Sequence, residues 1–125
     1  MKRRAAGFTL IELMVVMAII AALMTLAAPR YFSSLDNSKE TSLRHSLSVM
    51  RDALDRFYGD TGRYPDSLEE LVERRYLRGM PLDPITERTD LWLVVAPPEG
   101  AAGAVGDVHS GASGQARDGS AYGEW

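Results

Sequence analysis

The residue with the clearest chemical consequence is Glu12, because its carboxyl group lies inside an apolar run. From Phe8 to Ala28 no other side chain is ionisable, and most of the run is Leu, Ile, Val, Met or Ala. An ionised carboxylate deep in a membrane helix costs about 2.5–3.5 kcal/mol on insertion scales, so such a group is usually retained for a partner. We therefore expect Glu12 to meet a charged partner in an apolar environment.

Other reactive residue types give weaker signals. The sequence Asp107-Val108-His109-Ser110 holds the residue types of a hydrolytic triad. Neighbours along a strand point to opposite faces, however, whereas a triad must converge in space. No P-loop, Rossmann or zinc signature occurs. The chain has no cysteine and a formal net charge of -3, which excludes thiolate metal sites and gives no reason to expect a nucleic-acid partner. We expect no catalytic residue.

The apolar run is long enough to cross a membrane. About 20 residues at about 1.5 Å each span the roughly 30 Å hydrocarbon core, and Pro29 closes the run. The Lys and Arg residues at 2–4 favour a cytoplasmic N-terminus, which places the rest of the chain across the membrane. A conventional signal peptide cleaved near Ala28, or a permanent anchor, is the simpler alternative. Neither alternative explains Glu12.

After Pro29 the sequence becomes amphipathic. Its apolar residues recur mostly at spacings of three and four, which is typical of one helical face. They are Leu35, Leu43, Leu47, Met50, Leu54 and Phe57. We expect one helix over 8–58, bent or locally unwound at Pro29, whose apolar face needs cover from the remaining chain. His45 lies among polar residues and is expected to be exposed.

The chain after this helix predicts a short second helix. The Gly and Pro residues of 59–65 indicate a loop. Ser67, with Glu70 three residues on, is a capping box. A helix is expected to follow to about residue 75, burying Leu68, Leu71 and Val72.

Two strands and a tail complete the predicted head. Residues 91–95 and, more weakly, 104–109 are strand candidates. The Gly- and Ser-rich tail ends in Tyr122 and Trp125, which can anchor it to the head. The expected fold class is α+β, with a long N-terminal helix, transmembrane in its first half, packed against a small antiparallel sheet.

The segment 7–13 resembles the N-terminal signature of type IV pilins and type II secretion pseudopilins. It reads Gly7-Phe8-Thr9-Leu10-Ile11-Glu12-Leu13, and the family has a Gly, a Phe to be methylated and a Glu at the fifth mature position. The resemblance implies that a prepilin peptidase cuts between Gly7 and Phe8 and methylates the new amine of Phe8. Glu12 then meets that ammonium group on a neighbouring subunit, because an unpaired charge in low dielectric is costly.

Further segments resemble the major pseudopilin of type II secretion, in the same order along nearly all of the chain. They are Arg63-Tyr64-Pro65, Pro81-Leu82-Asp83-Pro84, Asp107-Val108-His109-Ser110-Gly111-Ala112 and Gly123-Glu124-Trp125. The resemblance implies a pilin-like fold in four parts: a cleaved basic leader (1–7), a filament-core helix (8–29), an amphipathic half-helix (30–58) and a periplasmic head (59–125).

The resemblance further implies a single-pass protein of the bacterial inner membrane that enters a periplasmic pseudopilus and drives protein export across the outer membrane. Its implied partners are copies of itself, the prepilin peptidase, minor pseudopilins and the inner-membrane assembly platform. The alternative is a minor pilin of a type IV pilus, serving adhesion or DNA uptake, although no cysteine pair closes a C-terminal loop. A secreted binding module would instead begin near Ala28 or Pro29.

Heads of that family bind structural Ca²⁺ in their C-terminal loop, so the resemblance also implies a calcium site. Hard cations take carboxylate and carbonyl oxygens, commonly about six to eight of them. The candidate ligands are Asp107, Ser110 and Asp118. The loop is shorter than in the family, Ala121 stands where the family often has an acid, and Arg117 adds a positive charge. A loop held by Tyr122, Trp125 and backbone hydrogen bonds is the alternative.

Overall fold

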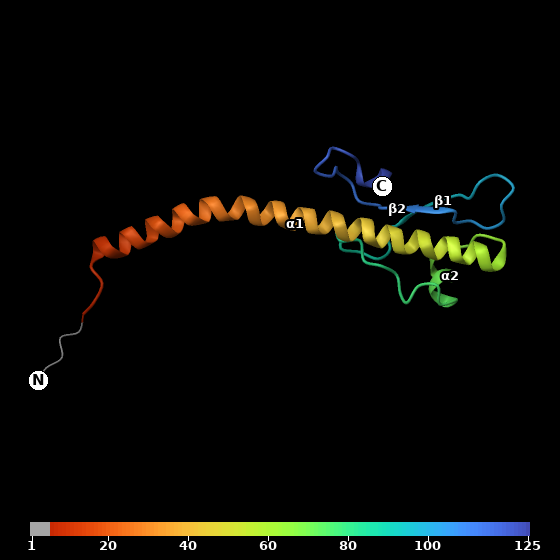
Figure 1. Ribbon diagram of the computed structural model, residues 1–125, viewed down its shortest axis with the longest axis horizontal. Helices are drawn as coiled ribbons and strands as arrows, with labels where there is room; N and C mark the ends of the chain where they lie inside the picture. Colours follow the sequence, from red (N-terminus) through yellow and green to blue (C-terminus); the bar gives the residue numbers. More distant parts are fainter. Residues whose placement is uncertain (1–5) are drawn as a thin grey trace, which may run out of the picture. The chain divides into compact units, whose positions relative to one another are not determined.

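The computed structural model describes residues 6–125 and has an α+β, pilin-like architecture, as predicted. In chain order it contains helix α1, helix α2, strands β1 and β2, and a short 3-10 helix, Tyr122–Glu124 (Figure 1). The chain forms two compact units, one ending at Asp36 and the other spanning Asn37–Trp125. The basic residues 2–4 of the predicted leader lie outside the described residues.

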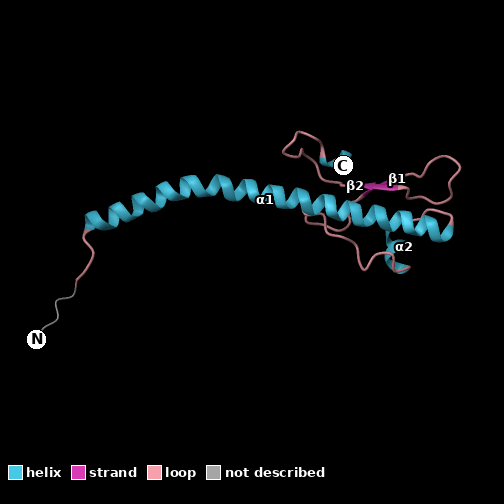
Figure 2. Cartoon of the chain, viewed as in Figure 1, coloured by secondary structure: helices cyan, strands magenta, loops and turns pink. Residues whose placement is uncertain are grey.

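Helix α1 spans Leu10–Thr61 and is the largest element of the chain (Figure 2). Thr9 begins it as the N-cap, because its hydroxyl oxygen accepts the Glu12 N–H at 3.1 Å. The helix is continuous through Pro29, although proline removes one intrahelical donor. The sequence predicted this helix to within a few residues at each end.

Helix α1 ends at Thr61, three residues after the predicted end at residue 58. The loop expected over 59–65 was therefore predicted to begin too early. Gly59 is helical, and the helix ends only after Thr61. The Thr61 hydroxyl donates to the Phe57 carbonyl at 2.7 Å. Gly62 then adopts φ +75°, and its N–H donates to the Tyr58 carbonyl at 2.8 Å. A glycine in the left-handed region is a common helix stop, and Gly62 is that stop here.

The hydrophobic core of the head lies on one face of α1. The predicted residues Leu43, Leu47, Met50, Leu54 and Phe57 are all buried. The remaining chain covers them with Leu68, Leu71, Leu77, Trp92, Val105 and Val108. The prediction for Leu35 is wrong, since this side chain is 40% exposed: it belongs to the first unit, whereas the buried cluster begins at Leu43. His45 is exposed, as expected.

Helix α2, Leu68–Glu73, starts where the sequence predicts and ends earlier. Ser67 is the N-cap, with its Oγ accepting the Glu70 N–H at 3.3 Å. The Glu70 carboxylate reaches the Asp66 N–H at 2.9 Å, which is one residue before the capping-box partner. Arg75 adopts φ +64°, so the chain has left helical geometry by that residue. Leu68 and Leu71 are buried, and Val72 packs partly against the core.

The sheet consists of β1, Leu93–Val95, and β2, Asp107–His109, paired antiparallel with Val94 opposite Val108. Both strands lie within the predicted segments and are shorter. The backbone comes very close to itself beside the sheet: a Cβ on Gly111 would lie 1.9 Å from the Leu91 carbonyl oxygen. Only glycine fits at this position without moving the backbone.

Candidate functional site

The predicted processing segment lies just outside the helix. Residues 6–9 are not helical, and α1 begins at Leu10. The bond between Gly7 and Phe8 is therefore in non-helical backbone, and the Phe8 side chain is 82% exposed. The Thr9 cap fixes this boundary, because its backbone carbonyl also accepts the Leu13 N–H at 3.1 Å. This peptide bond is therefore exposed and outside any helix, which leaves it accessible to a protease.

Gly7 has no structural reason to be glycine within the described chain. A Cβ built on it meets no heavy atom within 4 Å, and its φ is not in the left-handed region. A glycine that the fold does not require is explained more simply by recognition by another protein.

The helix that follows exposes an unbroken apolar surface containing Glu12. Its large apolar side chains from Leu10 to Leu26, together with Tyr31 and Phe32, are all at least 43% exposed. An 18-residue stretch of α1 is apolar enough to cross a membrane, and none of it is buried. Soluble monomers rarely expose a continuous apolar surface of this kind, so it indicates a lipid or protein partner.

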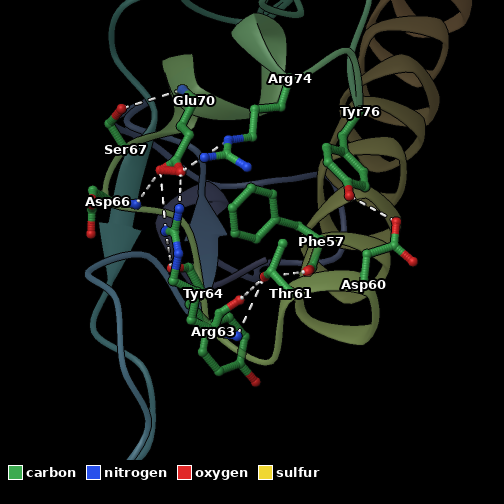
Figure 3. A network of polar contacts seen from close by, with 10 residues as sticks. All are labelled: Phe57, Asp60, Thr61, Arg63, Tyr64, Asp66, Ser67, Glu70, Arg74 and Tyr76. Atoms are coloured by element: carbon green, nitrogen blue, oxygen red, sulfur yellow. Dashed lines mark hydrogen bonds and ion pairs between the residues drawn. The ribbon is translucent and has the colours of Figure 1, made fainter.

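The Arg63-Tyr64-Pro65 segment connects α1 to α2 through a polar network (Figure 3). Arg63 Nη2 lies 2.5 Å from Glu70 Oε1, and Arg74 Nε lies 3.7 Å from the same oxygen. The Arg63 guanidinium also lies 5.0 Å from the centroid of the buried Phe57 ring. Tyr76 packs edge-on against that ring and donates from its hydroxyl to Asp60 at 2.7 Å. These contacts hold α2 on α1 and carry no obvious chemistry of their own.

Each of the predicted calcium ligands has a protein partner of its own. Asp107 Oδ1 lies 3.0 Å from Arg51 Nε. The Ser110 hydroxyl is fully buried and donates to Asp83 Oδ2 at 2.5 Å. Asp118 Oδ1 accepts from the N–H and hydroxyl of Ser120 at 2.9 and 2.5 Å, and these bonds lower the pKa of Asp118.

This donor set does not fit a calcium ion. A guanidinium beside Asp107 repels a cation, and the Ser110 oxygen is committed to a buried carboxylate. Within residues 6–125 no group of three or more His, Asp or Glu side chains is placed to hold a metal ion. Calcium binding stays a prediction, and these contacts argue against these three residues as its ligands.

Asp107, His109 and Ser110 do not form a triad in the geometry described. The Ser110 hydroxyl donates to Asp83. His109 Nε2 lies 3.9 Å from Asp107 Oδ2, while its Nδ1 contacts the main-chain oxygen of Trp125. The buried Asp83 was missed as a site residue. Its position between Leu82 and Pro84 suggests a turn, and its Oδ1 accepts the Ile85 N–H at 2.8 Å.

Three polar residues of α1 contact the C-terminal segment and were also missed. They are Glu40, Arg44 and Arg51. Their spacing of four and seven residues places them on one side of a helix, beside the apolar face. The spacing was visible in the sequence, but nothing in the sequence indicated which segment they contact.

Comparison with known proteins points to one family. The prokaryotic N-terminal methylation motif matches residues 2–28. The type II secretion system core protein G of Pseudomonas aeruginosa is 33% identical over 99 residues, covering 66% of this chain and 70% of that protein. The core protein G of Klebsiella pneumoniae is 31% identical over 98 residues, covering 66% and 70%.

A second kind of relative shares a shorter part of the chain. The type IV major pilin protein PilA of Myxococcus xanthus is 37% identical over 68 residues, covering 54% of this chain and 31% of that protein. No solved structure matches the chain at a significant level.

Proposed function

This chain belongs to the family of type II secretion system core protein G, the major pseudopilin, and we propose that it is the structural subunit of a pseudopilus that drives protein export across the outer membrane. One observation carries the proposal: the first part of α1 exposes a continuous apolar surface interrupted by the single carboxylate of Glu12. Such a surface is stable in a bilayer before assembly and among identical helices afterwards.

The proposed first step is processing by a prepilin peptidase. Cleavage between Gly7 and Phe8 removes the basic residues 2–4 and keeps the whole apolar helix, and methylation then modifies the new amine of Phe8. The exposed, non-helical backbone around this bond supports the proposal. Gly7 supports it as well, since the fold does not require a glycine there.

The second step is assembly, in which Glu12 pairs with the Phe8 ammonium of a neighbouring copy. Either charge alone among apolar helices would be costly, so the pair favours one axial register between subunits. The mature chain begins as a single-pass protein of the inner membrane with its head in the periplasm. Minor pseudopilins and the inner-membrane platform are its proposed partners in assembly. The proposed role of the chain is structural and includes no catalysis.

N-terminal peptide mass spectrometry of protein purified from host membranes tests the processing step. We expect a mature chain that begins at N-methylated Phe8. A start near Pro29 would make the protein a conventionally secreted domain, and an intact Met1 would leave only a membrane anchor. Gly7→Leu should block cleavage without disturbing the head, because a Cβ built on Gly7 meets no heavy atom within 4 Å.

The second candidate function is a pilin of a type IV pilus, which the similarity to the PilA protein favours. Deleting the gene separates the two functions. A pseudopilin deletion stops release of exported proteins into the medium and leaves twitching and DNA uptake intact. Loss of twitching or transformation with normal secretion would support the pilin instead.

A further inference from the structure

The C-terminal segment 112–125 contains little regular structure, yet it is fastened to α1 at several points. Ala112 and Ala116 are buried. Within the segment, an isolated bridge pairs Gln115 with Ala121, and Trp125 Nε1 donates to the Ser120 hydroxyl at 2.8 Å. These contacts close a compact loop, and other groups must hold that loop against the helix.

Glu40 holds the middle of the loop. Its Oε1 accepts the Arg117 N–H at 2.8 Å and the Tyr122 hydroxyl at 3.3 Å. Hydrogen bonds to a charged acceptor are stronger than neutral ones. One helix carboxylate therefore contacts a loop amide and an aromatic hydroxyl five residues apart in the sequence.

Arg44 and Arg51 hold the end of the loop. The Arg44 guanidinium lies 3.8 Å from the centroid of the Trp125 ring, which is within cation–π range. Arg51 Nη2 donates to the main-chain oxygens of Trp125 at 2.6 Å and Val108 at 2.9 Å. Its Nε donates to Asp107 at 3.0 Å. Arg51 thus joins α1, β2 and the end of the loop.

From these contacts we infer that Glu40, Arg44 and Arg51 form a latch that orders residues 112–125 without any divalent cation. The Glu40 carboxylate accepts two hydrogen bonds from the loop, Arg51 donates to the Trp125 main-chain oxygen, and the Arg44 guanidinium covers the Trp125 ring. In particular, Arg51 stands beside Asp107, where a cation would otherwise be expected to bind.

Hydrogen exchange of the full-length protein in detergent, followed by mass spectrometry, tests the latch. For the wild type we expect residues 112–125 to exchange at the same rate with excess EDTA and with excess CaCl₂. For Arg51→Met we expect exchange of residues 107–125 to rise by about tenfold or more under both conditions, since a hydrogen bond to a charged group contributes that much to an opening equilibrium. The apolar stem of methionine retains part of the packing.

The matched control is Arg56→Met, which removes an exposed arginine from the same helix. Arg56 Nε contacts only the Asp52 carbonyl of its own helix, at 3.5 Å, among the hydrogen bonds described. We expect no change in residues 107–125. Exchange in α2 and around the buried Phe57 identifies any variant that has unfolded as a whole.

Two results would overturn the latch. One is protection of residues 112–125 that appears only with CaCl₂ in the wild type, a measurement that depends on no variant. The other is an Arg51→Met protein that exchanges like Arg56→Met. If Arg51→Met fails to fold, Glu40→Gln replaces it, with an expected rise in exchange confined to residues 114–122.

Discussion

At the residue scale, the Glu70 carboxylate shows how one charge ties several segments of the head together. Its oxygens accept from Arg63 and from the Asp66 N–H, and its own helix begins at the Ser67 cap. The hydrogen bond from Arg63 is the largest cause that lowers the pKa of Glu70 below its ordinary value of 4.5, and the Asp66 N–H is the next. Desolvation opposes both and does not outweigh them.

This shift predicts a pH dependence of stability. Because the pKa of Glu70 is lower in the folded protein, its contribution is complete above pH 4.5 and is lost as the pH falls through the folded-state pKa. We expect the stability difference between wild type and Glu70→Gln to shrink steadily on acidification. Urea unfolding followed by the fluorescence of Trp92 and Trp125 at a series of pH values measures it.

The pH prediction has a clear control in Glu69→Gln, which removes the neighbouring exposed carboxylate. The pKa of Asp90 is lowered by its hydrogen bond with Arg88, and the pKa of Asp118 is lowered as well. Both carboxyl groups are present in every variant, so their contributions to stability cancel when two variants are compared. A Glu70→Gln protein that differs from wild type by the same amount at every pH would show that the ionised carboxylate contributes nothing.

Individual contacts were only partly predictable at this scale. The Ser67 cap could be predicted because capping is local, and its donor lies three residues along the chain. The partner of Arg51 could not, since the main-chain oxygen of Trp125 lies 74 residues away in the sequence. The sequence likewise shows the oxygen atoms of the predicted calcium ligands but not the side chains that contact them, which are Arg51, Asp83 and Ser120.

At the scale of elements, two glycines near the end of α1 have opposite effects on the stability of the helix. Gly59 lies within the helix, where glycine costs roughly 0.5–1 kcal/mol relative to alanine. Gly62 adopts φ +75°, where a residue with a Cβ costs about 1–2 kcal/mol. A Cβ at either position meets no atom within 4 Å, so backbone conformation alone decides the outcome.

We therefore expect Gly59→Ala to stabilise the head by up to about 1 kcal/mol and Gly62→Ala to destabilise it by about 1 kcal/mol. Each variant is the control for the other, since the added methyl group is the same. Urea midpoints of the two full-length proteins in detergent measure the difference. Equal midpoints would mean that Gly62 does not terminate the helix.

Phe57 packs the C-terminal part of α1 against the residues on either side of α2. Its side chain is fully buried, packs against Tyr76 and has the Arg63 guanidinium over its ring. Truncation leaves a cavity and removes these ring contacts, so we expect Phe57→Ala to cost about 3–5 kcal/mol in unfolding free energy. The exposed Leu82 is the control, and Leu82→Ala should change stability by less than about 0.5 kcal/mol. A similar loss in both variants would contradict this packing.

The elements themselves were largely predictable, whereas their ends were not. Apolar spacing identified the buried face of α1 because that face follows directly from helical period. Gly59 led to a predicted helix end that is too early. This glycine remains helical, and the chain leaves helical geometry only at Gly62. The strands are shorter than predicted because only three residues of each strand form pairs with the other. Contacts across the head set this length, and the local sequence does not.

At the scale of the whole molecule, the two compact units have different surfaces. The unit of residues 37–125 has a buried apolar core, although strand β1 and Leu82 are exposed, whereas the large apolar side chains of the unit ending at Asp36 are exposed. Soluble monomers rarely expose a continuous apolar surface of this kind, so the surface of the first unit indicates a lipid or protein partner. In the proposed assembly of identical chains, we expect association to depend on Glu12, the one ionisable side chain between Phe8 and Ala28.

Glu12→Gln tests this dependence. The bond between Gly7 and Phe8, the proposed cleavage site, is unaltered, so we expect normal cleavage and methylation. Assembly should fail, because the Phe8 ammonium loses its counter-charge and breaking a buried ion pair costs about 3–5 kcal/mol. Mass spectrometry measures processing, and electron microscopy of filaments sheared from cells that overproduce the protein measures assembly, with an expected loss of at least about tenfold.

The control for this variant is Glu69→Gln, which makes the same chemical change at an exposed site on the head. It should assemble normally, since its carboxylate faces water, where removing a charge costs little. Filaments of normal abundance from Glu12→Gln would show that apolar packing alone sets the register and that the acid is not needed for pairing. Uncleaved Glu12→Gln would show that the peptidase itself binds the acid. Only processed but unassembled protein assigns the Glu12 carboxylate to the contact between subunits.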